Sequence, residues 1–141
     1  MKKDLNILEA LLEAQKIAFA PFVFQASVAA KKLGIFAILA KNPSSEVEIS
    51  KSCNISIYGV KIIAELLLCA NVLTHKNGKY ALSKIGECLY FDAMSDANMD
   101  FTADVCYQGL YELSECIKRG KPLGLKMFGD WDSIYPHLSE L

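Results

Sequence analysis

The sequence has little net charge, few histidines and no glycine-rich loop, and each shortage excludes a class of function. The formal net charge is −1 over 141 residues, so the chain as a whole has no electrostatic attraction to nucleic acid or to an anionic membrane. His75 and His137 have no nearby nucleophile and no ligand cluster at metal spacing. Gly120, Gly124 and Gly129 are too scattered for a phosphate or dinucleotide loop. We therefore expect no catalytic, cofactor-binding or metal-binding residues on this chain.

Paired cysteines are also missing. The five cysteines follow one another at spacings of 16, 19, 18 and 10 residues, at Cys53, Cys69, Cys88, Cys106 and Cys116. Because the number is odd and no C-x-x-C pair occurs, neither a zinc site nor a disulfide framework is predicted. We expect reduced, mostly buried thiols, which are typical of the cytoplasm.

An uninterrupted apolar run long enough for a membrane is absent as well. The most apolar stretch, residues 17–30, is shorter than the roughly 20 residues that a spanning helix needs, and it contains Pro21. Acidic residues interrupt the region that a signal peptide would need to keep apolar. We expect no membrane partner. Because 52% of the residues are nevertheless hydrophobic, we also expect apolar surface to be buried against a partner.

What is present is a hairpin of two short strands. The strands are predicted at residues 72–75 and 79–82, where apolar and polar residues alternate. They are joined by Asn77 and Gly78, a pair that tolerates a positive φ at both central positions of a turn.

Two helices precede this hairpin. They are predicted at residues 47–53 and 57–70, with Ser45 and Glu48 as a capping box for the first and Ser56 as the N-cap of the second. A helix-turn-helix followed by a hairpin is the order of elements in a winged helix. The fold class is therefore expected to be mainly α, a winged helix with additional N- and C-terminal helices, dimeric.

The helix at residues 57–70 occupies the place of a DNA-reading helix, but its side chains do not suit that role. Only Tyr58, Lys61 and Glu65 are expected to face outward. Reading the major groove takes Arg, Lys, Asn or Gln, and binding phosphates takes several basic residues. We expect no specific binding to nucleic acid. A dimeric winged-helix transcription regulator is kept as an alternative because the order of elements is that of such proteins.

Residues 4–19 predict a helix that is apolar on two sides. Its two neighbouring apolar stripes consist of Leu5, Leu8, Leu12 and Phe19, and of Ile7, Leu11, Ala14 and Ala18. Such a helix has more apolar surface than its own domain needs. Because two-fold dimers are the commonest oligomers, we predict a homodimer. The expected interface residues are Leu8, Leu12, Phe19 and Phe22.

Pro21 is expected to end this first helix and to restart the chain, because proline suits a first helical turn and not an interior. A second helix follows at residues 22–33, with Gly34 as its C-terminal stop.

After the wing, one long helix is predicted at residues 99–118. Its core face is expected to consist of Thr102, Cys106, Leu110, Leu113 and Ile117. A loop-like, aromatic tail follows it.

Three segments in this order carry a family resemblance. They are FVFQASVAAKKLGIFAIL at residues 22–39, the block from EIS to GECL at residues 48–89, and GKPLGLKMFGDWDSIYPHLSEL at residues 120–141. Together they resemble the N-terminal dimerisation (winged-helix) domain of the S-adenosylmethionine-dependent O-methyltransferases, in which a helical domain precedes a Rossmann-like catalytic domain.

The resemblance implies a helical winged-helix dimerisation domain at residues 1–120 and a linker at residues 121–141 toward an absent catalytic domain. It implies a non-catalytic, substrate-capping role in a methyltransferase that acts on a small-molecule acceptor. No cofactor is expected on this chain, and S-adenosylmethionine is expected for the parent protein. The implied substrate pocket wall consists of Cys106, Tyr107, Leu110 and Tyr111. A stand-alone dimerising scaffold is a third interpretation.

Overall fold

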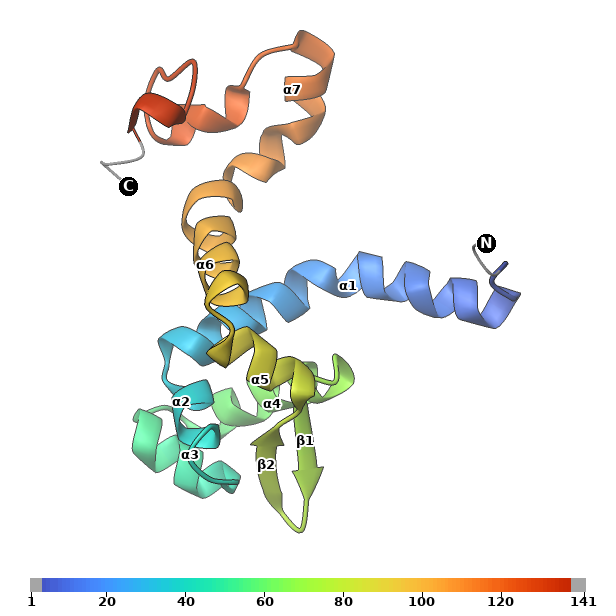
Figure 1. The fold of residues 1–141 in the computed structure, drawn as a ribbon, viewed down its shortest axis with the longest axis vertical. Helices are drawn as coiled ribbons and strands as arrows, with labels where there is room; N and C mark the ends of the chain where they lie inside the picture. Colours follow the sequence, from blue (N-terminus) through green and yellow to red (C-terminus); the bar gives the residue numbers. More distant parts are fainter. Residues whose placement is uncertain (1–3, 138–141) are drawn as a thin grey trace. The chain divides into compact units, whose positions relative to one another are not determined.

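The computed structural model describes residues 4–137 and divides the chain into two compact units, Met1–Asp92 and Ala93–Leu141 (Figure 1). Helices dominate the described residues, and a single two-stranded sheet accompanies them. A mainly helical fold with a hairpin wing is thus confirmed. The expected functional boundary at residue 120 stays a prediction.

The first helix, α1, runs without a break from Ile7 to Lys32, so the predicted restart at Pro21 is wrong. Proline cannot donate to the carbonyl of Ile17, four residues earlier. However, the Ile17 side chain is 78% exposed, so water has access to this part of the helix and can satisfy that carbonyl. The sequence reading also missed the N-cap. The Asn6 side chain accepts from the backbone N–H of Glu9 at 3.0 Å, and the Asn6 N–H donates to the Glu9 carboxylate at 2.9 Å.

The next helices begin and end close to the predicted residues. Gly34, with φ of 81°, separates α1 from α2 (Ile35–Leu39). Helix α3 (Glu46–Cys53) carries the predicted capping box between Ser45 and Glu48. Asn54 ends this helix in the left-handed conformation, and the Ser56 hydroxyl accepts from the Gly59 N–H at the start of α4 (Ile57–Cys69).

The wing consists of β1 (Leu73–Lys76) and β2 (Lys79–Leu82), paired antiparallel. The turn residues Asn77 and Gly78 both have a positive φ, as predicted. Ser44 extends the pairing on the other side of β2, because its backbone and that of Tyr80 exchange hydrogen bonds of 2.9 and 2.8 Å.

The core of the first unit lies where the last turns of α1 pack against α4, with α2, α3 and the hairpin around them (Figure 1). Its largest fully buried side chains are Phe36, Ile35, Ile49, Leu67 and Val60. Helix α5 (Lys84–Phe91) follows the wing and is capped by Ser83. Burial of these side chains holds the wing against the helices. Only the C-terminal end of α1 contributes to this core.

The second unit contains several short helical segments in place of the predicted long helix. Helix α6 (Ala93–Phe101) begins earlier than expected and continues into a π-helical turn, Thr102–Cys106. A 3₁₀ turn, Gly109–Glu112, separates this turn from α7 (Leu113–Arg119). Two further 3₁₀ turns follow, at Leu123–Met127 and Tyr135–His137.

The predicted core face of that long helix is also wrong. Leu110 and Leu113 are each 51% exposed, and Ile117 is 74% exposed. The π and 3₁₀ turns change the rotation per residue, so a pattern spaced for an α-helix no longer points to one side. Met99 is the buried hydrophobic residue among the described residues of this unit.

Gly86 offers a test of how tightly α5 packs on the wing. A Cβ at this position would lie well inside contact distance of the Val72 carbonyl oxygen, which already accepts from the Ser83 N–H. We expect Gly86→Ala to destabilise the protein by about 1–3 kcal/mol because backbone has to move. Chemical denaturation followed by circular dichroism measures this.

The matched control is Gly59→Ala in α4. A Cβ there would approach only the Ser56 hydroxyl, at 3.3 Å, and alanine is the better helix former. Equal stability of Gly86→Ala and the wild type would contradict the observed packing of α5.

Candidate functional site

The first candidate site is the exposed part of α1. No side chain from Leu5 to Phe22 is buried in the described structure. The four predicted interface residues, Leu8, Leu12, Phe19 and Phe22, are 69%, 64%, 56% and 59% exposed. A row of large apolar side chains in water is unfavourable, and on a soluble protein such a patch marks an interaction surface.

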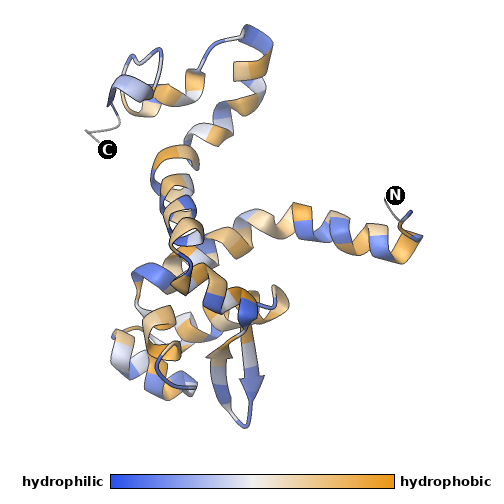
Figure 2. Ribbon diagram, viewed as in Figure 1, coloured by the Kyte–Doolittle hydropathy of each residue, from blue (hydrophilic) through white to orange (hydrophobic). Residues whose placement is uncertain are grey.

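The four predicted interface residues share one face of α1, whereas Ile17, which is 78% exposed, lies on another side. At about 100° per residue, the spacing from Leu8 to Leu12, Phe19 and Phe22 keeps these side chains on one side of the helix. The charged residues Glu9, Glu13 and Lys16 lie on the adjoining side of the helix, where the Lys16 ammonium is 2.6 Å from the Glu13 carboxylate. Figure 2 shows hydrophobic and hydrophilic segments alternating along this part of α1. The helix is therefore amphipathic where it has no core of its own to cover.

Phe19 and Phe22 lie next to each other on this face. Their ring centroids are 6.0 Å apart and the rings are tilted by 48°, within the range that favours aromatic pairs. The pair forms the end of the exposed face nearest to the domain core, which begins at Ala26.

The second candidate site lies in the second unit, where the four predicted pocket residues divide between two cavities. Tyr107 and Tyr111 line a cavity of about 860 Å³, whereas Cys106 and Leu110 line a second cavity of about 310 Å³. The sequence placed these residues together because a continuous helix would group them. The turns of the backbone separate them.

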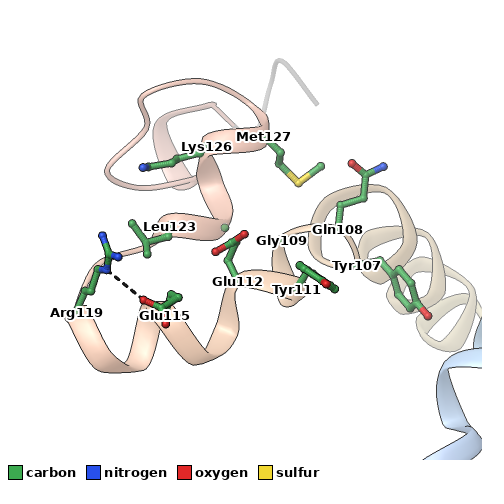
Figure 3. Close-up of a pocket in the computed structure, with 11 residues that line it drawn as sticks. Tyr107, Gln108, Gly109, Tyr111, Glu112, Glu115, Arg119, Leu123, Lys126 and Met127 are labelled. Atoms are coloured by element: carbon green, nitrogen blue, oxygen red, sulfur yellow. Dashed lines mark hydrogen bonds and ion pairs between the residues drawn. The ribbon is translucent and has the colours of Figure 1, made fainter.

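The larger cavity has both apolar and charged residues in its lining and lies between the 3₁₀ turn, α7 and the Leu123–Met127 segment (Figure 3). Glu115 lines this cavity. Its carboxylate forms ion pairs with Arg119 Nε at 3.3 Å and with Lys118 Nζ at 2.8 Å. Glu112 points toward the Leu123–Met127 segment in Figure 3. With carboxylates and cations on one wall, this cavity can hold a polar or zwitterionic group.

The smaller cavity is apolar and shares the glycines Gly109 and Gly124 with the larger one. The backbones of these glycines touch. A Cβ on Gly124 would lie 2.6 Å from the Gly109 carbonyl oxygen, and one on Gly109 would lie 3.0 Å from the Gly124 carbonyl oxygen. The lack of a side chain at both positions thus permits the contact that stands between the two cavities.

All five cysteines are free thiols, and the expectation that most are buried is wrong. Cys69 and Cys88 are exposed and the other three are half-buried. Cys69 is the last residue of α4, where the helix leaves the core. Burial raises the pKa of the Cys53 thiol.

Other kinds of site find no support in the part of the chain that the structure describes. Within residues 4–137, no three His, Cys, Asp or Glu side chains gather as a metal ion would require. No single helix of these residues is long and apolar enough to cross a membrane. Helices α3 and α4 reach the required length and apolar composition only when they are counted together, and the chain bends sharply between them.

Residues 11–80 match the family model of the Dimerisation2-like domain. This part of the chain is a Dimerisation2-like domain. The match covers α1 from Leu11 onward and reaches Tyr80 in the wing, so it includes Leu12, Phe19 and Phe22. Leu8 and the four pocket residues lie outside it.

Solved structures share the fold of the whole chain. It is similar to the S-adenosylmethionine-dependent methyltransferase SibL in its apo form, with 22% identity, a TM-score of 0.77, and coverage of 95% of this chain and 40% of that one. It is also similar to human N-acetylserotonin methyltransferase in complex with SAM, with 18% identity, a TM-score of 0.73, and coverage of 100% and 43%.

A structure described as a pericyclic reaction enzyme is similar as well, with 13% identity, a TM-score of 0.76, and coverage of 96% and 37%. The chain thus spans about two-fifths of the length of these proteins. A comparison with curated proteins finds no significant match.

The glycine contact that follows the Dimerisation2-like domain can be tested by substitution. We expect Gly124→Ala to destabilise the second unit, because the added Cβ would collide with the Gly109 backbone. Trp131 is the only tryptophan, and its ring stacks on that of His137, with the ring centroids 3.9 Å apart. Its fluorescence during thermal unfolding therefore reports on this unit, and we expect the midpoint to fall by several degrees.

Gly120→Asn is the matched control. Gly120 has a φ of 60° and open space around its Cβ position, and asparagine tolerates this conformation. A lower midpoint for the control than for Gly124→Ala would mean that the glycine contact does not stabilise the unit.

Proposed function

We propose that this chain is the dimerisation part of an S-adenosylmethionine-dependent methyltransferase that acts on a small molecule, and that it pairs with a second copy through α1. The observation that carries the proposal is the exposed apolar face of α1 in a Dimerisation2-like domain. The fold shared with the methyltransferases described above supports the reaction class.

The size of the apolar face fits a dimer interface. Full burial of one large apolar side chain contributes about 1.5–3 kcal/mol. Because a two-fold interface buries the same four side chains on both copies, Leu8, Leu12, Phe19 and Phe22 contribute at most roughly 12–24 kcal/mol. Association costs about 4–15 kcal/mol in lost translational and rotational freedom. The face can therefore offset this cost, and the neighbouring stripe adds to it, since its members Ile7 and Leu11 are 73% and 53% exposed.

The surface of α4 favours this function over DNA binding. Its exposed residues include Ile57, Tyr58 and Ile62, and Lys61 lies 3.8 Å from the Glu46 carboxylate. Apolar groups and a paired lysine offer little to base edges or phosphates. The transcription regulator is therefore the weaker alternative.

The second unit fits a role as one wall of a pocket that other parts of the protein complete. Its exposed large apolar residues are Met94, Phe101, Leu110, Tyr111, Leu113, Ile117, Met127 and Tyr135. So many apolar side chains outside a core indicate that further protein covers them. In the proposed protein, Tyr107 and Tyr111 face the polar part of the acceptor, and Cys106 and Leu110 face its apolar part.

Dimerisation is the first test. We expect the chain to have the mass of a dimer by light scattering at micromolar concentration. Leu8→Glu combined with Leu12→Glu should shift it to a monomer, because unpaired carboxylates would be buried in the interface. A monomeric wild-type chain would refute the proposed pairing.

The control is Ala20→Glu, which adds one negative charge, half that of the double variant, to the side of α1 that carries Glu13 and Lys16. We expect this variant to remain a dimer. If it dissociates as readily as the double variant, the effect is one of total charge and not of the apolar face.

Cofactor binding tests the reaction class. We expect no calorimetric signal for S-adenosylmethionine with the 141-residue chain, because the cofactor needs a glycine turn after a strand and an acidic residue for its ribose. A longer chain that includes the proposed catalytic domain should bind it. Low-micromolar binding by the 141-residue chain would contradict the assignment, and a longer chain that fails to bind would favour a different reaction on the same fold.

A further inference from the structure

Two of the five free thiols line the same apolar cavity. Cys106 ends the π-helical turn and Cys116 lies in α7, and both line the cavity of about 310 Å³. The other side chains of its wall are Phe101, Val105, Leu110, Pro122, Leu125 and Ile134. None of these lining residues carries a charge.

The cavity is large enough for a small molecule. Ligand pockets begin at about 300 Å³, and an apolar cavity of about 150 Å³ accepts a benzene ring. A volume of about 310 Å³ therefore accommodates a molecule of one or two rings. The close contact of Gly109 with Gly124 gives the cavity a wall of backbone with little freedom to move.

The lining selects by charge. The cavity is open to solvent, since Phe101 and Leu110 in its lining are 48% and 51% exposed. A charged ligand would therefore lose only the part of its hydration that faces this wall, but it would gain no ion pair in return, which is unfavourable. A neutral apolar ligand loses little and buries apolar surface. Cys69 and Cys88 are exposed, and neither lines this cavity.

We propose that this cavity is a capture site for small, uncharged, apolar electrophiles, such as α,β-unsaturated carbonyl compounds. Binding places the activated double bond beside Cys106 or Cys116, and proximity raises the rate of attack. The sulfur forms a bond to the β-carbon, the π electrons of the double bond move to the α-carbon, and the α-carbon takes up the proton that the thiol releases. The addition needs no oxidant and has no leaving group.

The test compares two maleimides of the same reactivity class on the full 141-residue chain. One is neutral N-phenylmaleimide and the other is its para-carboxylate, which is charged at neutral pH. Peptide mass spectrometry gives the labelling rate of each cysteine with each reagent. The ratio of the two rates at one sulfur cancels the intrinsic reactivity of that thiol.

We expect the ratio of neutral to charged labelling to be at least about 10-fold higher at Cys106 and Cys116 than at Cys69 and Cys88. A factor of 10 corresponds to about 1.36 kcal/mol. Equal ratios at all four cysteines would overturn the proposal. This readout is independent of oligomeric mass and cofactor binding, so it can fail while the dimerisation and cofactor tests of the proposed function succeed.

Two further measurements assign the selectivity to the cavity. Leu110→Trp narrows the cavity and should lower the ratio at Cys106 and Cys116, whereas Tyr111→Trp, one residue along and lining the other cavity, should not. N-phenylsuccinimide, which has the same shape and no double bond, should slow labelling of the two cavity thiols and leave Cys69 unchanged. Labelling that this competitor does not slow would refute the site even if Leu110→Trp fails to fold.

Discussion

Tyr80 holds the first unit together, because different segments contact its backbone, its hydroxyl group and its ring. Its backbone pairs with Ser44, its hydroxyl donates to the Glu46 carboxylate at 3.0 Å, and its ring lies 4.6 Å from that of His75. The side chain is buried, and burial, followed by the Glu46 carboxylate, raises the pKa of Tyr80. A shift of the hairpin by one residue would turn this ring to solvent. The hairpin therefore has one register, and α3 is fixed beside it.

This fixed unit gives α1 a surface to pack on, but only for its C-terminal end. A 26-residue helix is about 39 Å long at 1.5 Å per residue. The buried residues of α1 lie between Ala26 and Ala30, so most of that length has no contact with a core in the described structure. The high apolar content of the chain thus reflects surfaces that its own core does not use. This mismatch is the physical reason to expect a second copy on α1 and further protein on the second unit.

Local chemistry made much of the first unit predictable. Ser45 with Glu48, Ser56, Asn54 and the pair Asn77-Gly78 each act within a few residues, so their roles can be read from the sequence. Pro21 was misjudged because the cost of an interior proline depends on whether water has access to the helix around it. The exposed positions of Leu8 and Leu12 agree with the apolar pattern, while the pairing that this pattern predicts depends on a second molecule.

The second unit shows the limit of local rules. The sequence by itself determined the capped helices, the wing and the two-sided apolarity of α1, because these depend on spacing and on contacts between near neighbours. Only the tertiary structure decided that Gly109 meets Gly124, that the helix predicted at residues 99–118 is interrupted by π and 3₁₀ turns, and that Cys106 faces one cavity while Tyr107 faces another. The reason is physical: a contact between residues 15 positions apart overrides helical periodicity when both lack a side chain, and no local pattern shows which two glycines will meet.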